Sequence, residues 1–452
     1  GESQRIQLAA SLGSNLVGSI YVLDEPSVGL HSKDTEKLIK VLNKLRDLGN
    51  TIIVVEHDEL IIKSADHIID IGPYAGSLGG EINAYGSLSK FLKKETLTSK
   101  YLSGNLKILK KRQNKSNKNY ISLIGARENN LKNINVKFPL DCLTLITGIS
   151  GSGKTTLVKN ILYPALQRRF NDYSFKPGDF SSLEGNFDEL KGVEYIDQNP
   201  IGKSSRSNPV TYIKVYDDIR TLFSSLELSK IRDYKPKHFS FNVDGGRCEK
   251  CKGEGSLTIE MQFMADVVIE CNDCKGTRFK NEICEIQYNG KSINDLLNMT
   301  VDDSIVFFQS NNYNRIAQKL KPLSDVGVGY IKLGQSSSTL SGGEAQRIKL
   351  ASFLSNRSFD KKVLFIFDEP TTGLHFHDIN KLVKSFYHLI EKGHSIIVVE
   401  HNLDLIKIAD HIIDLGPGAG ENGGEIIAEG NLEKIIKNKN SFTGKYLLKQ
   451  LN

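Results

Sequence analysis

The sequence predicts an α/β protein built on a doubly wound, mostly parallel sheet, and three observations support this. Short apolar, β-branched runs alternate with longer stretches of helical periodicity. The run LTLITGISGSGKTTL places a glycine-rich phosphate-binding loop between an apolar strand and a helix. The stretch 1–86 recurs near the end of the chain. We therefore expect ligands at the carboxyl ends of the strands.

The internal repeat predicts two homologous domains. It is carried by three motif pairs: GESQRIQLAA at Gly1 with GEAQRIKLAS at Gly343, IYVLDEPSVGLH at Ile20 with LFIFDEPTTGLH at Leu364, and TIIVVEHDELIIKSADHIIDIGP at Thr51 with SIIVVEHNLDLIKIADHIIDLGP at Ser395. The second copy has a phosphate loop and a long insertion upstream, whereas the first copy begins inside a motif. We therefore expect the chain to be the C-terminal part of a longer protein.

The bulk composition is that of an ordinary globular protein of 452 residues, enough for two to four domains. No run approaches the roughly 18 apolar residues that a membrane span needs, so we expect a cytoplasmic protein without a membrane partner. The net charge of +6 suits a nucleic-acid partner but does not demand one.

The expected domain boundaries follow from the repeat, a polar linker KKRQNKSNKN, and the position of the insertion. We expect the C-terminal part of a first nucleotide-binding domain at 1–105, a linker at 106–119, a second nucleotide-binding domain formed by 120–165 and 330–452, and an inserted helical region at 166–329 that carries a cysteine-containing module at about 245–282.

The phosphate-binding loop is the clearest chemical motif, because strand, loop and helix all agree with a P-loop. Its glycines let backbone N–H groups curl around phosphate oxygens, Lys154 supplies a charge to the β- and γ-phosphates, and the Thr155 hydroxyl can bind Mg²⁺. A chance glycine-rich turn is the weak alternative. The candidate ATP-binding residues of this loop are Gly148, Ser150, Gly151, Gly153, Lys154, Thr155 and Thr156.

Acidic residues at a strand end predict the other half of the nucleotide site. Asp368 closes an apolar strand and can hold Mg²⁺ through water, while Glu369 can polarise the attacking water. His401 ends the next strand and can contact the γ-phosphate or orient that water, and Gln198 can sense magnesium and water. An isolated D-E-P could start a helix and a lone histidine could be structural, but both motifs recur, with counterparts at Asp24, Glu25 and His57.

The motif LSGGEAQR predicts a second anion site, made by Ser341, Gly342, Gly343 and Glu344 at a helix N-terminus. A simple N-capped helix would explain the serine but not the glycine pair. The motif resembles the signature of ABC ATPases. In that family the signature covers the nucleotide held by an opposing cassette, so that ATP joins two half-sites.

Four of the six cysteines have the spacing of a tetrahedral zinc site: Cys248, Cys251, Cys271 and Cys274 form two C-x-x-C knuckles, each followed by Lys-Gly. Such a closed site is structural rather than catalytic. Unrelated buried cysteines or a redox pair are weaker alternatives. Cys142 and Cys284 are expected to be ordinary buried thiols.

Basic residues near the knuckles predict a phosphate-contacting surface, although a solvated charged face is nearly as good an interpretation for any one of them. The candidate DNA contacts are Arg247, Lys275 and Arg278 in the zinc module, accompanied by Lys250, Lys252 and Lys280, and Lys203 and Arg206 in the loop GKSSRSNP.

Over essentially its whole length the chain resembles the UvrA family of bacterial nucleotide excision repair, at GARENNLKNI, TGISGSGKTTL, IDQNPIGKSSRSNPVTY, FSFNVDGGRCEKC, CNDCKG, LGQSSSTLSGGEAQR and DEPTTGLHFHD. The resemblance implies an ATPase that uses ATP, Mg²⁺ and Zn²⁺, forms a homodimer, recognises damaged duplex DNA through its deformability, and loads UvrB through regions absent from this chain.

Two alternatives remain open at the level of sequence. Another tandem-cassette ABC ATPase, such as a translation factor or a transporter subunit, would share the nucleotide motifs but does not predict the knuckles. If the chain is instead a zinc-dependent DNA-binding module with a non-hydrolysing cassette, its affinity for DNA should not change with nucleotide. Since Lys154 faces only the remnant Gly1, Glu2 and Gln4 of a first signature, two copies could cross-pair, with Ser341 of one facing Lys154 of the other.

Overall fold

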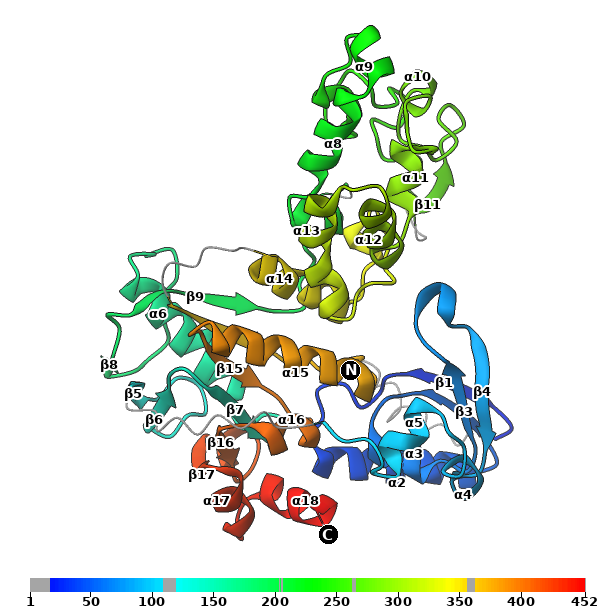
Figure 1. Ribbon diagram of the computed structural model, residues 1–452. Helices are drawn as coiled ribbons and strands as arrows, with labels where there is room; N and C mark the ends of the chain where they lie inside the picture. The colour runs from blue at the N-terminus through cyan, green and yellow to red at the C-terminus, as the bar shows by residue number, and fades with distance from the viewer. Residues whose placement is uncertain are drawn as a thin grey trace. The chain divides into compact units, whose positions relative to one another are not determined.

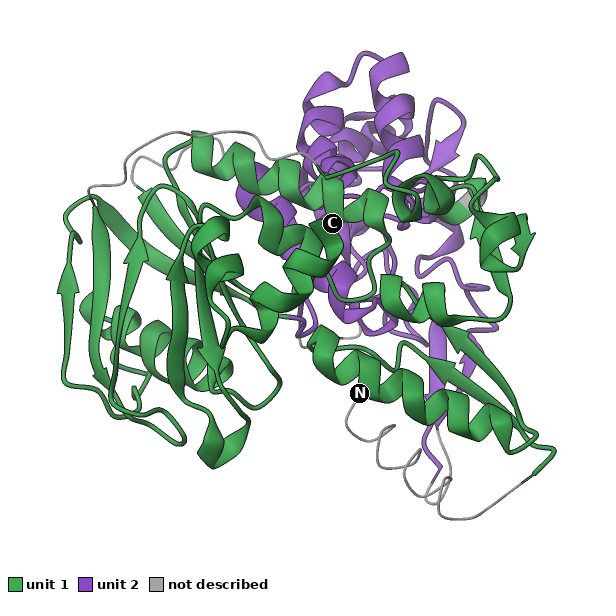
Figure 2. Cartoon of the chain, turned by 90° about the horizontal axis from the view of Figure 1, so that it is seen from below, with its two compact units in different colours: residues 1–197, 358–452 green, residues 198–357 purple. Residues whose placement is uncertain are grey.

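The computed structural model describes residues 17–108, 119–202, 204, 206–261, 266–355 and 362–451. They form two compact units, one of residues 1–197 and 358–452 and one of residues 198–357 (Figure 2). The remnant Gly1, Glu2 and Gln4, most of the expected linker 106–119, and Lys203 lie outside the described residues. None of the described helices has the length and apolar character needed to cross a membrane.

A six-stranded sheet organises the second repeat, in the order β17-β16-β7-β15-β14-β9 (Figure 1). Its neighbours pair in parallel except β16 and β17, which are antiparallel. This confirms the predicted α/β class. The strands are β7 (Leu143–Gly148), β9 (Leu190–Ile196), β14 (Lys362–Asp368), β15 (Ser395–Val399), β16 (His411–Gly416) and β17 (Glu425–Gly430).

A smaller antiparallel sheet and the helix after the phosphate loop close the core of this repeat. The sheet has the order β6-β5-β8, with β5 (Tyr120–Ala126), β6 (Ile134–Pro139) and β8 (Ser182–Gly185). Its inward side chains pack on the helical segment η2 (Thr156–Leu162) and on the central strands. The remaining helices are α6 (Tyr163–Arg169), α15 (Phe376–Glu391), α16 (Leu403–Ile408), η5 (Gly420–Asn422), α17 (Leu432–Lys437) and α18 (Phe442–Leu451).

Among the described residues, the first repeat has counterparts of β14, β15, β16 and β17 but none of β7 or β9. Strand β1 (Ile20–Asp24) pairs in parallel with β2 (Thr51–Val55), and β3 (Ile68–Gly72) pairs with β4 (Glu81–Gly86). Val22 is 69% exposed, whereas its counterpart Ile366 is fully buried by the packing around β7 and η2. The helices are α2 (Ser32–Asp47), α3 (Glu59–Ser64), η1 (Gly76–Leu78), α4 (Leu88–Phe91) and α5 (Leu97–Leu102).

The second unit is mainly helical and carries the cysteine knuckles at the base of the hairpin β10 (Ser256–Ile259) and β11 (Val267–Glu270). Its helices are α7 (Pro209–Tyr212), α8 (Tyr216–Ser225), α9 (Glu227–Ile231), η3 (Pro236–Phe239), α10 (Asn281–Cys284), α11 (Ile293–Asn298), α12 (Val301–Ser310), α13 (Asn314–Asp325), η4 (Ser337–Thr339) and α14 (Gly342–Ser355), and β12 (Gln287–Tyr288) pairs with β13 (Lys291–Ser292).

Candidate nucleotide site and cysteine cluster

The phosphate loop leaves the fully buried strand β7 and turns back on itself with three glycines at positive φ: Gly148, Gly151 and Gly153. A Cβ atom on Gly148 would lie 2.1 Å from the carbonyl oxygen of Leu415 on the neighbouring strand. Only glycine therefore fits this close approach. Asn130, from the predicted family motif GARENNL, donates to the carbonyl of Gly151 at 3.1 Å and so braces the loop.

Lys154 is buried beneath the loop. Its Nζ donates to the carbonyl oxygens of Gly148 and Ile149, each at 2.9 Å. Burial lowers the pKa of Lys154 to about 8, against the opposing effect of nearby carboxylates, of which Glu369 is the strongest. An added phosphate would favour the charged form further. The loop thus holds a buried amine where phosphate oxygens would lie.

Asp368 and Glu369 stand at the carboxyl end of β14, which lies between β15 and β9 in the sheet. The hydroxyl of Tyr195 donates to Asp368 Oδ2 at 2.7 Å, which fixes the orientation of this carboxylate. Glu369 adopts a φ of 46°, in the left-handed region that a non-glycine residue rarely occupies. Burial raises the pKa of Glu369 to about 7, with Glu400 and Asp368 adding to the shift.

His401 follows β15 and completes this cluster. Its Nε2 lies 3.7 Å from Glu369 Oε1, and its Nδ1 is buried with no hydrogen-bond partner among the described residues. Burial, followed by Lys154 and His31, lowers the pKa of His401 well below its ordinary value. The imidazole is therefore neutral and contacts the carboxylate as a polar neighbour, not as an ion pair. The structure brings together Lys154, Asp368, Glu369 and His401.

The first repeat reproduces the acidic half of this arrangement. Glu25 has a φ of 44°, and its Oε1 lies 3.6 Å from Nε2 of His57. Burial raises the pKa of Glu25, while His57 opposes the shift. Asp24 ends β1 as Asp368 ends β14. Among the described residues, no glycine-rich loop accompanies this set.

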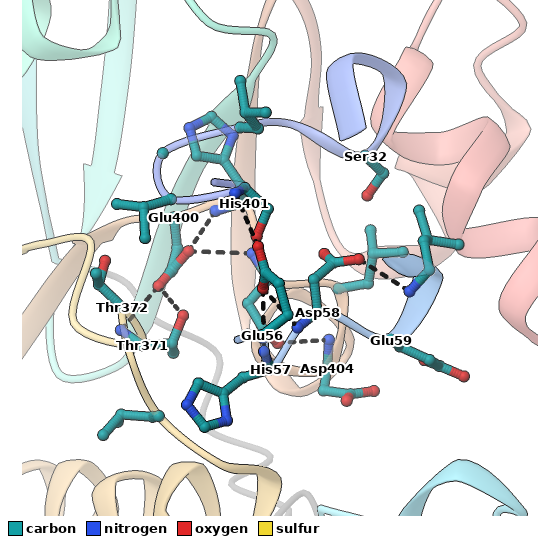
Figure 3. A pocket seen from close by; sticks show the side chains of 18 of the residues that line it. Ser32, Glu56, His57, Asp58, Glu59, Thr371, Thr372, Glu400, His401 and Asp404 are labelled. Carbon is teal, nitrogen blue, oxygen red and sulfur yellow. Dashed lines mark hydrogen bonds between the residues drawn. The ribbon is translucent and has the colours of Figure 1, made fainter. Parts of the chain in front are cut away.

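Two glutamates that the sequence analysis did not single out hold the acidic loops in place. Glu400 Oε1 accepts the backbone N–H of Thr371 at 2.9 Å, and Glu56 Oε1 accepts that of Ser27 at 2.8 Å. Figure 3 shows Glu56 and Glu400 with their hydrogen bonds in one pocket, which both repeats line and which has a volume of about 280 Å³. The sequence offers one indication of their importance, because each glutamate stands directly before a repeated histidine, His57 or His401.

The signature residues lie in the second unit, where Ser341 caps α14. Its hydroxyl accepts the backbone N–H of Glu344 at 3.2 Å, and the Glu344 carboxylate accepts that of Ser341 at 2.8 Å. A Cβ on Gly342 would lie 2.9 Å from the Cβ of Gln198, so Gln198 packs against the signature. Gly343 continues the first turn of the helix. The helix N-terminus expected at the signature is present, and Gln198 belongs to the same unit.

Four cysteines converge in the second unit. The Sγ atoms of Cys248, Cys251, Cys271 and Cys274 all lie within 4.8 Å of one another, and all four residues are buried. The separations are 3.9 Å between Cys248 and Cys271 and 3.6 Å between Cys251 and Cys274. Four sulfurs at about 2.3 Å from a tetrahedral zinc ion would be about 3.8 Å apart. The cluster therefore fits a closed Zn²⁺ site.

The backbone of the knuckles also suits thiolate ligands. Lys252 and Lys275, which follow the second cysteine of each knuckle, both have positive φ, as do the glycines after them. The N–H of Gly255 donates to Cys251 Sγ at 3.3 Å. The backbone N–H of Cys274 is the largest of the causes that lower the pKa of Cys271 to about 7. These donors stabilise negative charge on Cys251 and Cys271, whereas burial raises the pKa of Cys248 and of Cys274. Outside the cluster, Cys142 is buried and Cys284 is half-buried.

The candidate DNA-contacting residues differ in exposure and in the partners that they already have within the protein. Lys275 is exposed. Arg247 pairs with Asp244 at 2.7 Å, and Arg206 lies 3.6 Å from Glu254. Arg278 donates to the carbonyl of Gly334 at 2.9 Å and lies over the ring of Phe241. Arg278 thus has a packing role that its sequence context did not reveal.

Comparisons with known proteins give a consistent match. The chain is 54% identical over 453 aligned residues to UvrABC system protein A of Clostridium perfringens, covering 100% of the chain and 48% of that protein. It is 52% identical to the protein of the same name from Staphylococcus epidermidis, covering 99% of the chain and 47% of the relative. The chain therefore spans about half the length of these curated relatives. No protein-family model matches it.

Solved structures agree with this match. UvrA2 from Deinococcus radiodurans superposes with a TM-score of 0.92 at 41% identity, covering 99% of the chain and 54% of that structure. Archaeal ABCE1, in a model of its ribosome-bound state with Pelota, has a TM-score of 0.50 at 18% identity, over 93% of the chain and 54% of that chain, and shares the fold alone. The predicted ABC-type cassette is confirmed by these structures.

Proposed function

Because the chain belongs to the UvrA family of ABC ATPases, we propose that it is the ATP-driven, DNA-binding part of a damage-recognition protein of nucleotide excision repair. The observation that carries this proposal is the meeting of Lys154, Asp368, Glu369 and His401 at adjacent strand ends, in a chain that also gathers four cysteines. Translation factors and transporter subunits do not account for the cysteines.

The nucleotide chemistry follows from the residues present. The loop from Gly148 to Thr156 would hold the phosphates of ATP, while the Thr155 hydroxyl and Asp368 would hold Mg²⁺. Glu369 would accept a proton from the attacking water, and His401 would orient that water and Glu369. By the family signature, Ser341, Gly342, Gly343 and Glu344 would cover nucleotide in an opposing cassette, with Gln198 beside it.

The second unit would meet DNA through phosphate contacts. Zn²⁺ would tie the two knuckles together, so that a hairpin too small for its own core stays ordered. Lys275, Arg247 and Arg206 are the described candidates for phosphate contact, with Arg278 supporting them from within. Damaged duplex would be selected by the lower cost of bending or unwinding it. Parts of the longer protein outside this chain would load UvrB and complete a homodimer.

Damaged DNA should bind more tightly than undamaged duplex, and ATP with Mg²⁺ should change the affinity. We would measure fluorescence anisotropy of two otherwise identical duplexes, one with a single bulky lesion, across a salt series. Since phosphate contacts release counterions, log affinity should fall linearly with log salt. Lys154→Ala should keep DNA binding but lose the ATP effect, and exposed Lys159→Ala is the charge-matched control.

If the DNA affinity of the unaltered chain is the same with and without ATP, a zinc-dependent DNA-binding module with an inactive cassette would be favoured. Equal affinity for damaged and undamaged duplex would contradict damage recognition by this chain. Both outcomes are read from the same titrations, so they separate the two functions.

ATP hydrolysis should slow as pH falls through about 7, because Glu369 can act as a base only when ionised. Its pKa is raised from 4.5 to about 7, chiefly by burial. The same shift has a definite sign for stability: the protonated group stabilises the fold below pH 4.5, and this contribution is lost as pH rises through about 7. A profile of kcat against pH tests this, and a midpoint near 4.5 would contradict it.

A further inference from the structure

Two hydrogen-bond relays cross between the repeats, the first buried and the second partly buried, and neither takes part in the proposed nucleotide chemistry. In the first, Nε2 of His31 lies 3.2 Å from Thr443 Oγ1, and that hydroxyl donates to Asp414 Oδ1 at 2.9 Å. In the second, Nε2 of His375 lies 3.0 Å from Thr98 Oγ1, which donates to Asp70 Oδ1 at 2.8 Å. Each relay starts in one repeat and ends in the other.

The relays are counterparts in the internal repeat. His31 and His375 close the repeated motif DEPxxGLH, and Asp70 and Asp414 lie in the repeated strands β3 and β16. The threonines belong to the related segments TLTSKYL, which contains Thr98, and SFTGKYL. Two independent copies of one geometry indicate a built feature rather than a chance contact.

The direction of the hydrogen bonds is fixed by the helix caps. The Nδ1 atom of His31 accepts the backbone N–H of Lys33 at 3.2 Å, and that of His375 accepts the N–H of His377 at 3.2 Å. In a neutral ring the hydrogen must then be on Nε2, which donates to the threonine. Burial lowers the pKa of His31 to about 4, so its ring is neutral near pH 7. The threonine hydroxyl is left to donate to the aspartate.

Each histidine ends a loop that lies on the glutamate of the opposite repeat. A Cβ on Gly29 would lie 3.3 Å from Glu369 Oε2, and one on Gly373 would lie 3.1 Å from Glu25 Oε1. The loop of the first repeat also touches the phosphate loop, because Ser150 Oγ donates to the carbonyl of Gly29 at 3.0 Å. The first repeat thus supplies part of the wall around Glu369.

The first relay also reaches the base of the phosphate loop. Thr443 Oγ1 lies 3.4 Å from Oγ1 of Thr147, the residue directly before Gly148, and Thr147 pairs with Asp414 across β7 and β16. His31, Thr443, Thr147 and Asp414 are all buried. An anchor in this position holds the Gly29 loop against the strand that carries the phosphate loop.

We propose that His31 is a positioning residue for hydrolysis in the second repeat: through Thr443 it holds the Gly29 loop of the first repeat against Glu369 and Ser150. His375 does the same for Glu25 through Thr98. The kinetic consequence rests on the proposed ATPase function, whereas the anchoring of the loop does not.

The test is a double-mutant cycle in the full 452-residue chain. His31→Leu and Thr443→Val should each lower kcat for ATP hydrolysis about ten-fold, since each removes the same hydrogen bond, with KM within about two-fold. The double variant should be no slower than either single variant. His31→Gln, which keeps an N–H donor at a similar reach, should recover most of the rate. Exposed His388→Leu is the control.

Hydrogen exchange gives a second readout that needs no hydrolysis. In Thr443→Val without nucleotide, amides of residues 24–31 should exchange faster than in the unaltered chain, although the substitution is remote in sequence. Three results would each overturn the proposed relay. They are unchanged exchange in this segment, additive losses of kcat in the double variant, and a higher KM at constant kcat. Absence of any hydrolysis by the unaltered chain would instead count against the proposed ATPase, and the exchange result would still decide the anchoring.

Discussion

Glu369→Gln should lower kcat for ATP hydrolysis at least about 100-fold while leaving ATP binding nearly intact, because general-base catalysis contributes about 10²- to 10⁴-fold. The amide keeps the size of the carboxylate but cannot accept a proton from water. The geometry supports a base at this position: Glu369 is half-buried, lies beside His401 and Asp368, and has a pKa raised to about 7. Steady-state hydrolysis and equilibrium ATP binding, measured on the same preparation, separate the two effects.

Substitutions of two other glutamates serve as controls for the effect of Glu369→Gln. Glu429→Gln on the exposed edge of β17 removes a negative charge from the same unit and should leave kcat unchanged. Glu25→Gln alters the counterpart residue of the first repeat, which lacks a phosphate loop among the described residues, and should have a much smaller effect than Glu369→Gln. Equal losses from both substitutions would contradict the assignment of the base to Glu369.

The local chemistry of the site could be predicted from sequence because its signals are local. Gly148, Gly153 and Lys154 stand at fixed spacing between a strand and a helix, and the structure places them in a loop that only glycine can form. The cysteine spacing likewise predicted a cluster, and the four Sγ atoms converge. In both cases the motif is nearly the whole site.

No local sequence motif predicted the contacts between the two repeats. Gly29 lies against Glu369, and His31 reaches Thr443, across hundreds of residues of chain. Pairing of this kind depends on how two domains pack, which periodicity and spacing do not encode. Arg278 gives a related example, because a sequence shows its charge but not its position over Phe241. The repeat itself showed which residues to compare, but not that they would meet.

Cys271→Ser should remove bound zinc from the chain and unfold the module around residues 245–282. Serine cannot replace a thiolate as a ligand, and a closed Cys₄ site contributes on the order of 10 kcal/mol to local folding. Cys271, the first cysteine of the second knuckle, is fully buried, with its Sγ 3.9 Å from that of Cys248. Metal analysis should give one zinc per unaltered chain and close to none in the variant, with faster proteolysis confined to the module.

Cys284→Ser provides the matched control, because Cys284 lies in the same unit but outside the cluster and is only half-buried. It should retain zinc. If loss of the metal also abolishes the salt-dependent binding of DNA while ATP hydrolysis persists, the knuckles serve the DNA-binding surface and the cassette folds without them. Unchanged zinc content in Cys271→Ser would mean that four converging sulfurs do not hold the ion, and the feature that separates this chain from other cassettes would lose its chemical basis.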